Sequence, residues 1–315
     1  MCAVPICKEH RELRPADLIQ LFLLYKAACG LSEKTMKDYG YHLAKFFRLY
    51  PDALDFPRER TMEYLAGYSN PTSFNLRYSY LRCFWNWCAD EGYFRGSRHP
   101  LDGIKKKRPQ GRVIDIPESE LKKLLRQPNQ KTFAGFRDFV LMNLQLDTAI
   151  RPGEGLRLLP DDLRADRSEI EVRACVSKTR VARTLPVSES TVLLMKRLLL
   201  MHHPSWKDAT IFCTETGGPF KETSYGHAFK KYSTASKVKA TPYALRHCAA
   251  LLMLRNGVSA FTLASIMGHA DLSMTRRYLA ISNTDKHREH AAAGVMRLLN
   301  DEPPRPARVR TIGKP

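Results

Sequence analysis

A short basic segment without hydrophobic periodicity divides this chain into two parts. Residues 103–114 contain two glycines, one proline and four consecutive basic residues, Lys105–Arg108. Apolar residues recur at helical spacing on both sides of it. Because 315 residues exceed the usual size of one hydrophobic core, we interpret the segment as an interdomain linker. The expected domains are residues 12–102 and 115–300, and the proline-containing end, residues 301–315, is expected to be a disordered tail.

The first part carries the signals of a helical domain. Ser32 is suited to cap a helix that continues to Tyr50. Pro71 is suited to open a long helix that Gly92 ends. An apolar stripe at helical spacing predicts the buried face of that long helix: Phe74, Tyr78, Leu81, Trp85 and Cys88. Arg77 and Arg82 fall on its other faces, where they are candidate DNA contacts.

The second part has helical patterns interrupted by one stretch with strand character. Ile170 and Val172 alternate with charged residues, residues 177–180 indicate a turn, and Val181–Val187 indicates a returning strand. Helical spacing then resumes and continues through residues 273–281. The predicted fold class is therefore mainly α with a small antiparallel sheet (α+β).

The net charge indicates a polyanionic partner. Lys and Arg number 51 against 32 Asp and Glu, which gives a formal charge of +19 spread over both halves of the chain. Nucleic acid is the first candidate, and a generic solubilising charge is the alternative. The linker residues Lys105, Lys106, Lys107 and Arg108 could follow a phosphate backbone, and Arg180 and Arg183 on the hairpin could bind phosphate too.

Several other classes of protein are not expected. No apolar run has the roughly 18 residues of a membrane helix, and the first ten residues lack a signal-peptide pattern, so we expect a cytoplasmic protein. The eight cysteines form no CxxC pair, and without a secretory signal we expect no disulfides. Cys7 and His10 have ligand spacing but no second pair, so we expect neither a metal nor another cofactor.

Polar residues of the second part follow one another in a distinctive order. Glu154 stands three residues after Arg151, and Lys178 stands at the predicted hairpin turn. Tyr243-Ala-Leu-Arg246-His247 begins a helix, and Gly268-His269 precedes Tyr278 by nine residues. Each residue alone has an ordinary structural interpretation, such as a solvated lysine at a hairpin tip or a histidine at a helix C-terminus.

Taken together, these residues resemble the tyrosine recombinase (phage integrase) family over about residues 12–300. The resemblance implies a helical core-binding domain that clamps DNA, followed by a catalytic domain. It implies five catalytic residues at matching positions: Arg151, Lys178, Arg246, His269 and Tyr278. Tyr243 stands where the family usually has histidine. A phenol donates a hydrogen bond at neutral pH but is a poor base, so we expect Tyr243 to hold a phosphate oxygen.

Two neighbours of these residues are expected to support them. Glu154 is expected to orient an arginine rather than to touch DNA. His247 follows Arg246 but points about 100° around the helix from it, so we assign it a structural role.

The chemistry of these residue types fits phosphodiester exchange without metal or ATP. Two guanidiniums can stabilise the negative charge that gathers on a pentacoordinate phosphorus. A tyrosine nucleophile gives a 3′-phosphotyrosine that conserves the energy of the broken bond. Lys178 could protonate the leaving 5′-oxygen, and His269 or solvent could assist proton loss from Tyr278.

The resemblance therefore implies a site-specific DNA recombinase, for integration or transposition, of the simple two-domain type. The start of the first domain near residue 12 leaves little room for a further arm-binding domain. The implied partners are double-stranded DNA with paired sites and three further copies of the chain in a homotetramer. Whether a second recombinase takes part stays open. So does whether the apolar stripe of Lys286–Asn300 packs in cis or on a neighbour. In a bacterial cell the protein would be nucleoid-associated when bound to DNA.

Two alternatives belong to other classes. A type IB topoisomerase would use similar chemistry to relax supercoils, although a core-binding domain argues against it. A DNA-binding accessory protein without activity is the second, and Tyr243 is the only feature that favours it.

Overall fold

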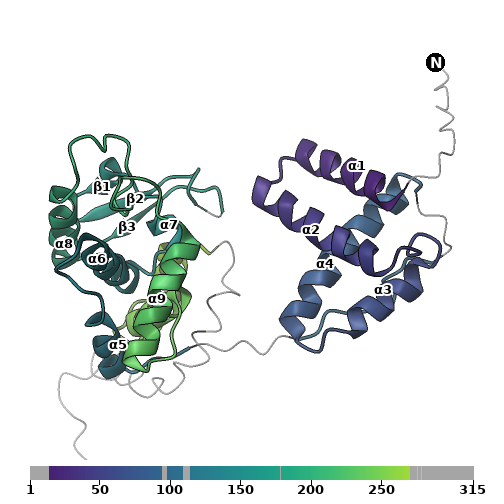
Figure 1. Cartoon of the computed structure of the whole chain (residues 1–315). Helices are drawn as coiled ribbons and strands as arrows, with labels where there is room; N and C mark the ends of the chain where they lie inside the picture. Colours follow the sequence, from purple (N-terminus) through teal and green to yellow (C-terminus); the bar gives the residue numbers. More distant parts are fainter. Residues whose placement is uncertain are drawn as a thin grey trace, which may run out of the picture. The chain divides into compact units, whose positions relative to one another are not determined.

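The computed structural model describes residues 14–93, 98–108, 114–177 and 179–269, together with Thr275 and Tyr278. The chain forms two compact units, residues 1–111 and 112–315 (Figure 1). Lys178, the predicted last helix Lys286–Asn300 and the predicted tail, residues 301–315, lie outside the described residues.

The described part of the first unit is helical. Its helices are α1 (Pro15–Ala28), α2 (Glu33–Leu49), α3 (Pro57–Ala66) and α4 (Pro71–Asp90). The predicted caps explain two starts, because the Ser32 hydroxyl accepts a hydrogen bond from the Thr35 amide at 3.3 Å and Pro71 is the first residue of α4. Gly92 follows the end of α4 with a φ of +75°, which favours glycine.

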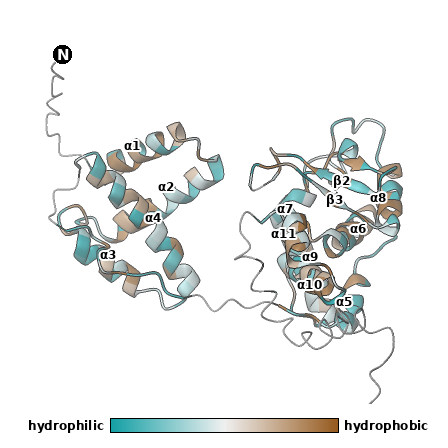
Figure 2. Cartoon of the chain, turned by 180° about the vertical axis from the view of Figure 1, so that it is seen from behind, coloured by the Kyte–Doolittle hydropathy of each residue, from teal (hydrophilic) through white to brown (hydrophobic). Residues whose placement is uncertain are grey.

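Aromatic side chains form the core of the first unit. Phe22 of α1 packs edge-to-face on Phe84 of α4, with 5.4 Å between the ring centroids. Trp85 is buried as predicted, and its indole N–H donates to the Thr61 hydroxyl of α3 at 3.1 Å. The hydropathy colouring of the helices shows apolar and polar residues alternating along them (Figure 2).

The second unit combines helices with one small sheet. Its helices are α5 (Glu118–Leu125), α6 (Phe133–Thr148), α7 (Pro152–Gly155), the 3-10 helix η1 (Pro160–Asp162), α8 (Glu189–Leu200), α9 (Glu222–Ser236), α10 (Pro242–Arg255) and α11 (Ala260–Met267). Helix α6 lies against α8 on one side and α10 on another. No helix within the described ranges is long and apolar enough to cross a membrane.

The sheet is antiparallel in the order β1-β2-β3. Its strands are β1 (Leu163–Arg164), β2 (Glu169–Val172) and β3 (Arg183–Pro186). Ile170 faces Leu185 across the β2–β3 pair, and both side chains are fully buried. The predicted fold class is confirmed. The two-residue strand β1 was not predicted, because it is too short to show an alternating pattern.

Candidate active site

A sharp turn between α6 and α7 positions Arg151. Ala149 has a φ of +52°, a left-handed conformation that is strained for a residue with a Cβ. The chain then places Arg151 at the N-terminus of α7, where its backbone amide donates to the Glu154 carboxylate at 3.3 Å. This turn exposes the Ala149 carbonyl to Arg246 of α10, which donates a hydrogen bond to it.

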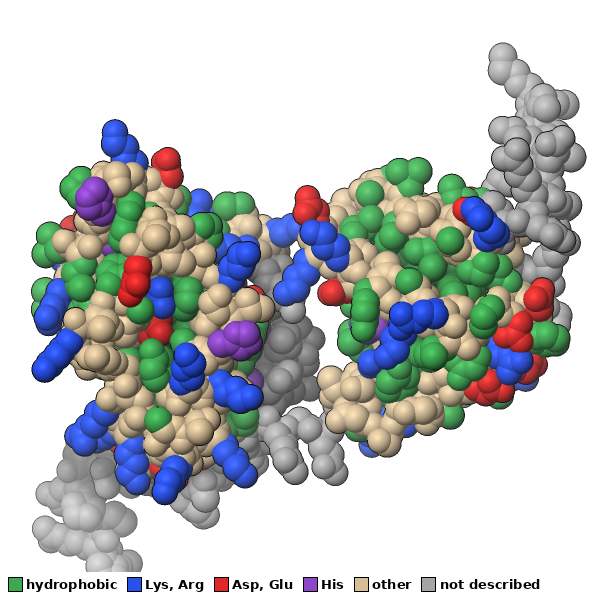
Figure 3. All heavy atoms as spheres, in the orientation of Figure 1, with side chains coloured by type: hydrophobic (Ala, Val, Ile, Leu, Met, Phe, Trp, Pro, Cys, Tyr) green, Lys and Arg blue, Asp and Glu red, His purple; other side chains and the backbone are tan. Residues whose placement is uncertain are grey.

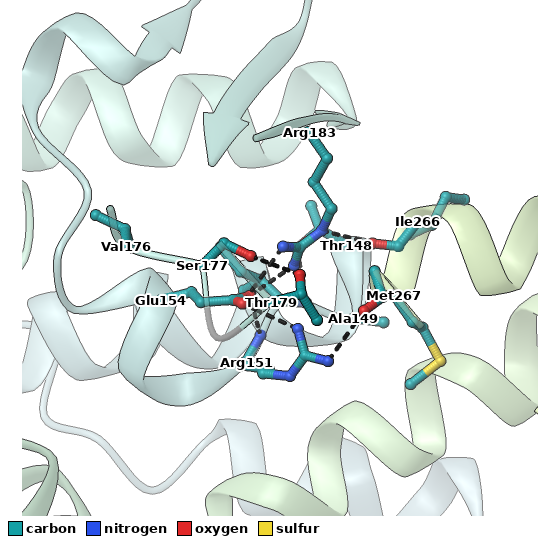
Figure 4. Close-up of polar contacts among 12 residues, drawn as sticks. Thr148, Ala149, Arg151, Glu154, Val176, Ser177, Thr179, Arg183, Ile266 and Met267 are labelled. Carbon is teal, nitrogen blue, oxygen red and sulfur yellow. Dashed lines mark hydrogen bonds and ion pairs between the residues drawn. The ribbon is translucent and has the colours of Figure 1, made fainter. Parts of the chain in front are cut away.

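Glu154 pairs with two arginines from different elements (Figure 4). Its side chain is 2% exposed, and it accepts from Arg151 Nη1 at 2.9 Å and from Arg183 Nη2 of β3 at 2.6 Å. Burial alone would raise the pKa of this carboxyl, but the two guanidiniums outweigh burial and hold the pKa below its ordinary value. Glu154 therefore stays ionised and fixes both arginines in place.

Arg246 is the most deeply buried cation of the site. Only 4% of its surface is exposed, and its Nη2 donates to the Met267 carbonyl at 2.8 Å. Burial, aided by the nearby charge of Arg151, lowers the pKa of Arg246 to about 10. The guanidinium thus remains charged at neutral pH.

Three consecutive carbonyls at the C-terminal end of α11 accept hydrogen bonds from the three arginines of the site. Arg183 donates to Ile266 at 3.1 Å, Arg246 donates to Met267, and Arg151 donates to Gly268 at 3.3 Å. The last carbonyls of a helix lack partners within the helix and carry partial negative charge, which explains why cations gather there. Gly268 ends α11 with a φ of +61°, and a Cβ at this position would lie 3.1 Å from Nε of Arg183. The close approach of the arginines therefore also favours glycine.

The chain after α11 brings His269 to the same site. Nε2 of His269 lies 3.4 Å from Nη2 of Arg246, and its Nδ1 lies 2.9 Å from the Thr275 hydroxyl. A guanidinium only donates, so Nε2 is the acceptor in this contact and the ring proton is assigned to Nδ1.

Tyr278 is buried among apolar residues of α10 and α11. It is 2% exposed and belongs to a cluster that includes Ala249, Leu263 and Met267. Its hydroxyl lies 2.6 Å from Nδ1 of His247. The structural role expected for His247 stays a prediction, and the contact shows which residue it meets. Its rotation around α10 away from Arg246 points it at the Tyr278 hydroxyl.

Tyr243, at the start of α10, is the most open of these residues. It is 49% exposed, and its pKa is raised above the ordinary value, first by partial burial and then by the charge of Glu222. Tyr243 therefore keeps its proton at neutral pH and can serve as a hydrogen-bond donor.

The two hairpin arginines differ. Arg183 is bound by Glu154 and by the Ile266 carbonyl within the site, and its predicted contact with phosphate stays a prediction. Arg180 is exposed and has a φ of +56°. The sequence could not reveal the Arg183–Glu154 pair, because the two residues are 29 positions apart. They meet only when α7 packs beside β3 in the folded chain.

The basic residues predicted to contact DNA in the first unit are partly engaged within it. Arg77 lies 3.9 Å from the centroid of the Tyr68 ring, and Arg82 donates to the Tyr78 hydroxyl at 2.7 Å. The ammonium of Lys107 lies over the Phe74 ring at 4.4 Å. Lys105, Lys106 and Arg108 are exposed. Figure 3 shows Lys and Arg side chains on the visible face of each unit.

The site has cations and hydrogen-bonding groups but no cluster of metal ligands. Within the described ranges, no group of three or more His, Cys, Asp or Glu side chains could hold a metal ion. Cys7 and His10 lie outside those ranges.

Comparison with known proteins gives consistent matches. The model of the phage integrase family matches residues 115–285. The tyrosine recombinase XerA of Pyrococcus horikoshii is 26% identical over 290 residues, which cover 90% of this chain and 95% of the archaeal protein.

Two solved structures share the fold. A Tn1549 transposon integrase in complex with transposon right end DNA has a TM-score of 0.67 at 17% identity, over 90% of this chain and 100% of that one. A lambda integrase tetramer bound to a Holliday junction has a TM-score of 0.67 at 18% identity, over 84% of this chain and 77% of that one.

Proposed function

Because the chain belongs to the phage integrase family of tyrosine recombinases, we propose that Tyr278 attacks a DNA phosphate held by Arg151 and Arg246. The protein is a site-specific recombinase, an enzyme that breaks and rejoins DNA. Attack by the Tyr278 oxygen breaks the bond between phosphorus and the 5′-oxygen, leaving a 3′-phosphotyrosine and a 5′-hydroxyl. The hydroxyl of a partner strand then attacks the phosphotyrosine and restores the backbone.

One observation carries this proposal: Arg151, Arg246, His269 and Tyr278, which span 128 positions of sequence, meet around the end of α11. Two guanidiniums next to each other repel, and Glu154 offsets only part of their charge. Such a pair is well suited to stabilise the extra negative charge that the phosphate oxygens carry in the transition state. Tyr243, exposed and protonated, can donate to a third oxygen.

Lys178 is proposed to protonate the leaving 5′-oxygen, a role that the family resemblance implies. Lys178→Ala should then slow the cleavage of ordinary DNA strongly and spare DNA with a 5′-bridging phosphorothiolate, whose leaving group needs no proton. Equal loss on both substrates would reject this role.

Trapping of the covalent intermediate tests the proposed function. A nicked suicide duplex, built on the site that footprinting identifies in DNA flanking the gene, should give a covalent complex with the wild-type protein. Tyr278→Phe should bind the same duplex equally well and give no covalent complex. Binding without any wild-type covalent complex would instead identify a DNA-binding protein without activity.

The assembly follows from the reaction. Exchange between two duplexes breaks four strands, so we propose a homotetramer on paired sites, as is known for the lambda integrase tetramer on a Holliday junction. Mass measurement of the protein on paired sites should give four chains of one kind. A requirement for a different chain would identify a partner recombinase. We further propose that the protein acts in the cytoplasm, where its DNA substrate is found, and associates with the nucleoid when bound.

A relaxing topoisomerase is the less favoured function. The family match and the likeness of the fold to recombinases that bind DNA at defined sites argue for recombination. Relaxation of a plasmid without recombination sites would favour the topoisomerase.

A further inference from the structure

The reaction proposed above requires an acceptor for the Tyr278 proton. A phenol has an ordinary pKa near 10, so it is a weak nucleophile at neutral pH unless a base removes its proton during attack. The base must lie within hydrogen-bond distance of the hydroxyl. Among the residues that the structure describes, the candidates near the site are Tyr243, His269 and His247.

Tyr243 and His269 are poorly suited to this task. Tyr243 is a phenol whose own pKa is raised, so it holds its proton more tightly than an ordinary tyrosine. Nε2 of His269 faces the guanidinium of Arg246 at 3.4 Å, and its Nδ1 faces the Thr275 hydroxyl at 2.9 Å. Both ring nitrogens of His269 therefore already have partners, Nε2 in Arg246 and Nδ1 in Thr275.

His247 contacts the reacting atom itself. Its Nδ1 lies 2.6 Å from the Tyr278 hydroxyl, and the tyrosine is 2% exposed. We assign the ring proton of His247 to Nε2, so that Nδ1 accepts a hydrogen bond from the Tyr278 hydroxyl. A phenol this deeply buried is shielded from bulk water, and His247 contacts its hydroxyl directly.

We propose that His247 is the catalytic base for Tyr278, an inference that rests on the proposed function. The Tyr278 O–H bond breaks, its proton passes to Nδ1 of His247, and the phenolate oxygen bonds to phosphorus as the 5′-oxygen leaves. In rejoining, the imidazolium returns the proton to the tyrosine oxygen as the phosphorus–tyrosine bond breaks. This pairing supplies the base at a site where Tyr243 occupies the position usual for histidine.

Single-turnover cleavage of the suicide duplex by His247→Asn tests the proposal. The asparagine oxygen lies close to the position of Nδ1 and can accept the phenol's hydrogen bond, but it cannot take up the proton. We expect about 10²- to 10⁴-fold slower formation of the covalent complex, with unchanged DNA binding. We also expect loss of the acidic limb of the pH–rate profile, which reports a base that must be deprotonated.

Control variants separate this role from a structural one. His227→Asn, on α9, should leave both the rate and the pH profile unchanged. His247→Ala should be slow, and added imidazole should raise its rate with a linear concentration dependence. A His247→Asn rate within twofold of wild type would overturn the proposal, and so would a retained acidic limb or a failure of imidazole to restore activity in folded His247→Ala.

The outcome for His247 is distinguishable from failure of the proposed function. If wild-type protein forms the covalent complex and Tyr278→Phe does not, the nucleophile is established whatever His247 does. A faster His247→Asn variant would show that the contact restrains Tyr278 instead of activating it, which also overturns the proposal.

Discussion

Two groups of basic side chains, one in each unit, have different partners. In the first, Arg77 and Lys107 lie over the rings of Tyr68 and Phe74, next to an aromatic core. In the second, Arg151, Arg183 and Arg246 donate hydrogen bonds to the last carbonyls of α11. Arg151 and Arg183 also pair with the carboxylate of Glu154. The net charge of the sequence counts both groups equally. Their partners, which the structure provides, decide which group stabilises the fold and which can stabilise a transition state.

The contrast between the units is tested most strongly by exchanging arginine for lysine in each. Arg246→Lys keeps the charge but cannot bond the Ala149 and Met267 carbonyls with one planar group, so cleavage should slow about 10²- to 10³-fold. Arg48→Lys, at an exposed position of α2, should change the rate by about twofold or less. Both are measured by covalent-complex formation. Equal losses would remove the distinction between the units.

Glu154→Gln examines how the arginines of the second unit are held. The substitution keeps the shape but leaves two buried guanidiniums without a carboxylate, which should lower the free energy of unfolding by about 3–5 kcal/mol. Glu63→Gln, whose carboxylate is half-exposed beside Arg60 in the first unit, should cost about 1 kcal/mol or less. Urea unfolding at neutral pH measures both.

The same pair of variants gives a pH dependence with a defined sign. Although burial acts to raise the pKa of Glu154, Arg183 and Arg151 leave it lowered, so its contribution to stability is present above the ordinary glutamate pKa. The contribution is lost as pH falls through the lower pKa of the folded state. The difference between wild type and Glu154→Gln should therefore shrink below about pH 4. A difference that stays constant down to acid unfolding would contradict the ionised pair.

Asn75→Ala addresses the anchoring of the linker in the first unit. The Asn75 amide donates to the Lys107 carbonyl at 2.7 Å and accepts from the Lys107 amide at 2.9 Å. Loss of both bonds should lower stability by about 1–2 kcal/mol without changing the rate of cleavage once DNA is bound. Asn86→Ala, at an exposed position of the same helix, is the control. Tryptophan fluorescence follows the unfolding, and a slower cleavage step would assign the anchor a part in catalysis.

Tyr243→His should have the smallest effect. Both side chains can donate a hydrogen bond to a phosphate oxygen, and with His247 as the base a second imidazole at position 243 adds little. Cleavage at neutral pH should stay within about fivefold of wild type. A collapse of activity would show that the phenol has a specific part in the reaction.

Local signals in the sequence predicted much of the fold. Ser32 and Gly92 mark helix ends because caps depend on neighbouring residues alone, and the stripe containing Trp85 is buried because its spacing matches one helix face. The mainly helical class with a small sheet follows from the same periodicities. The strand β1 has only two residues, which is too few to show an alternating pattern.

The site was predictable only where order along the chain was informative. The family resemblance singled out Arg151, Arg246 and Tyr278 as candidates. It could not show that Arg183 shares Glu154, or that His247 meets Tyr278 across 31 positions, since such contacts depend on packing between distant segments. Likewise the sequence indicated an interdomain linker but could not show that Lys107 is bonded to Asn75 and to the Tyr68 carbonyl.

Three guanidiniums donate hydrogen bonds to the last turn of α11, so substrate binding should affect the stability of this turn. A phosphate that draws Arg151 or Arg246 toward itself competes with the Gly268 or Met267 carbonyl for the same hydrogen atoms. Binding of a phosphate by these arginines should therefore change the hydrogen bonds of the last turn of α11. Amide hydrogen exchange at this turn should change when DNA binds. Substitutions that weaken the turn should reduce this change, even at positions that do not contact DNA.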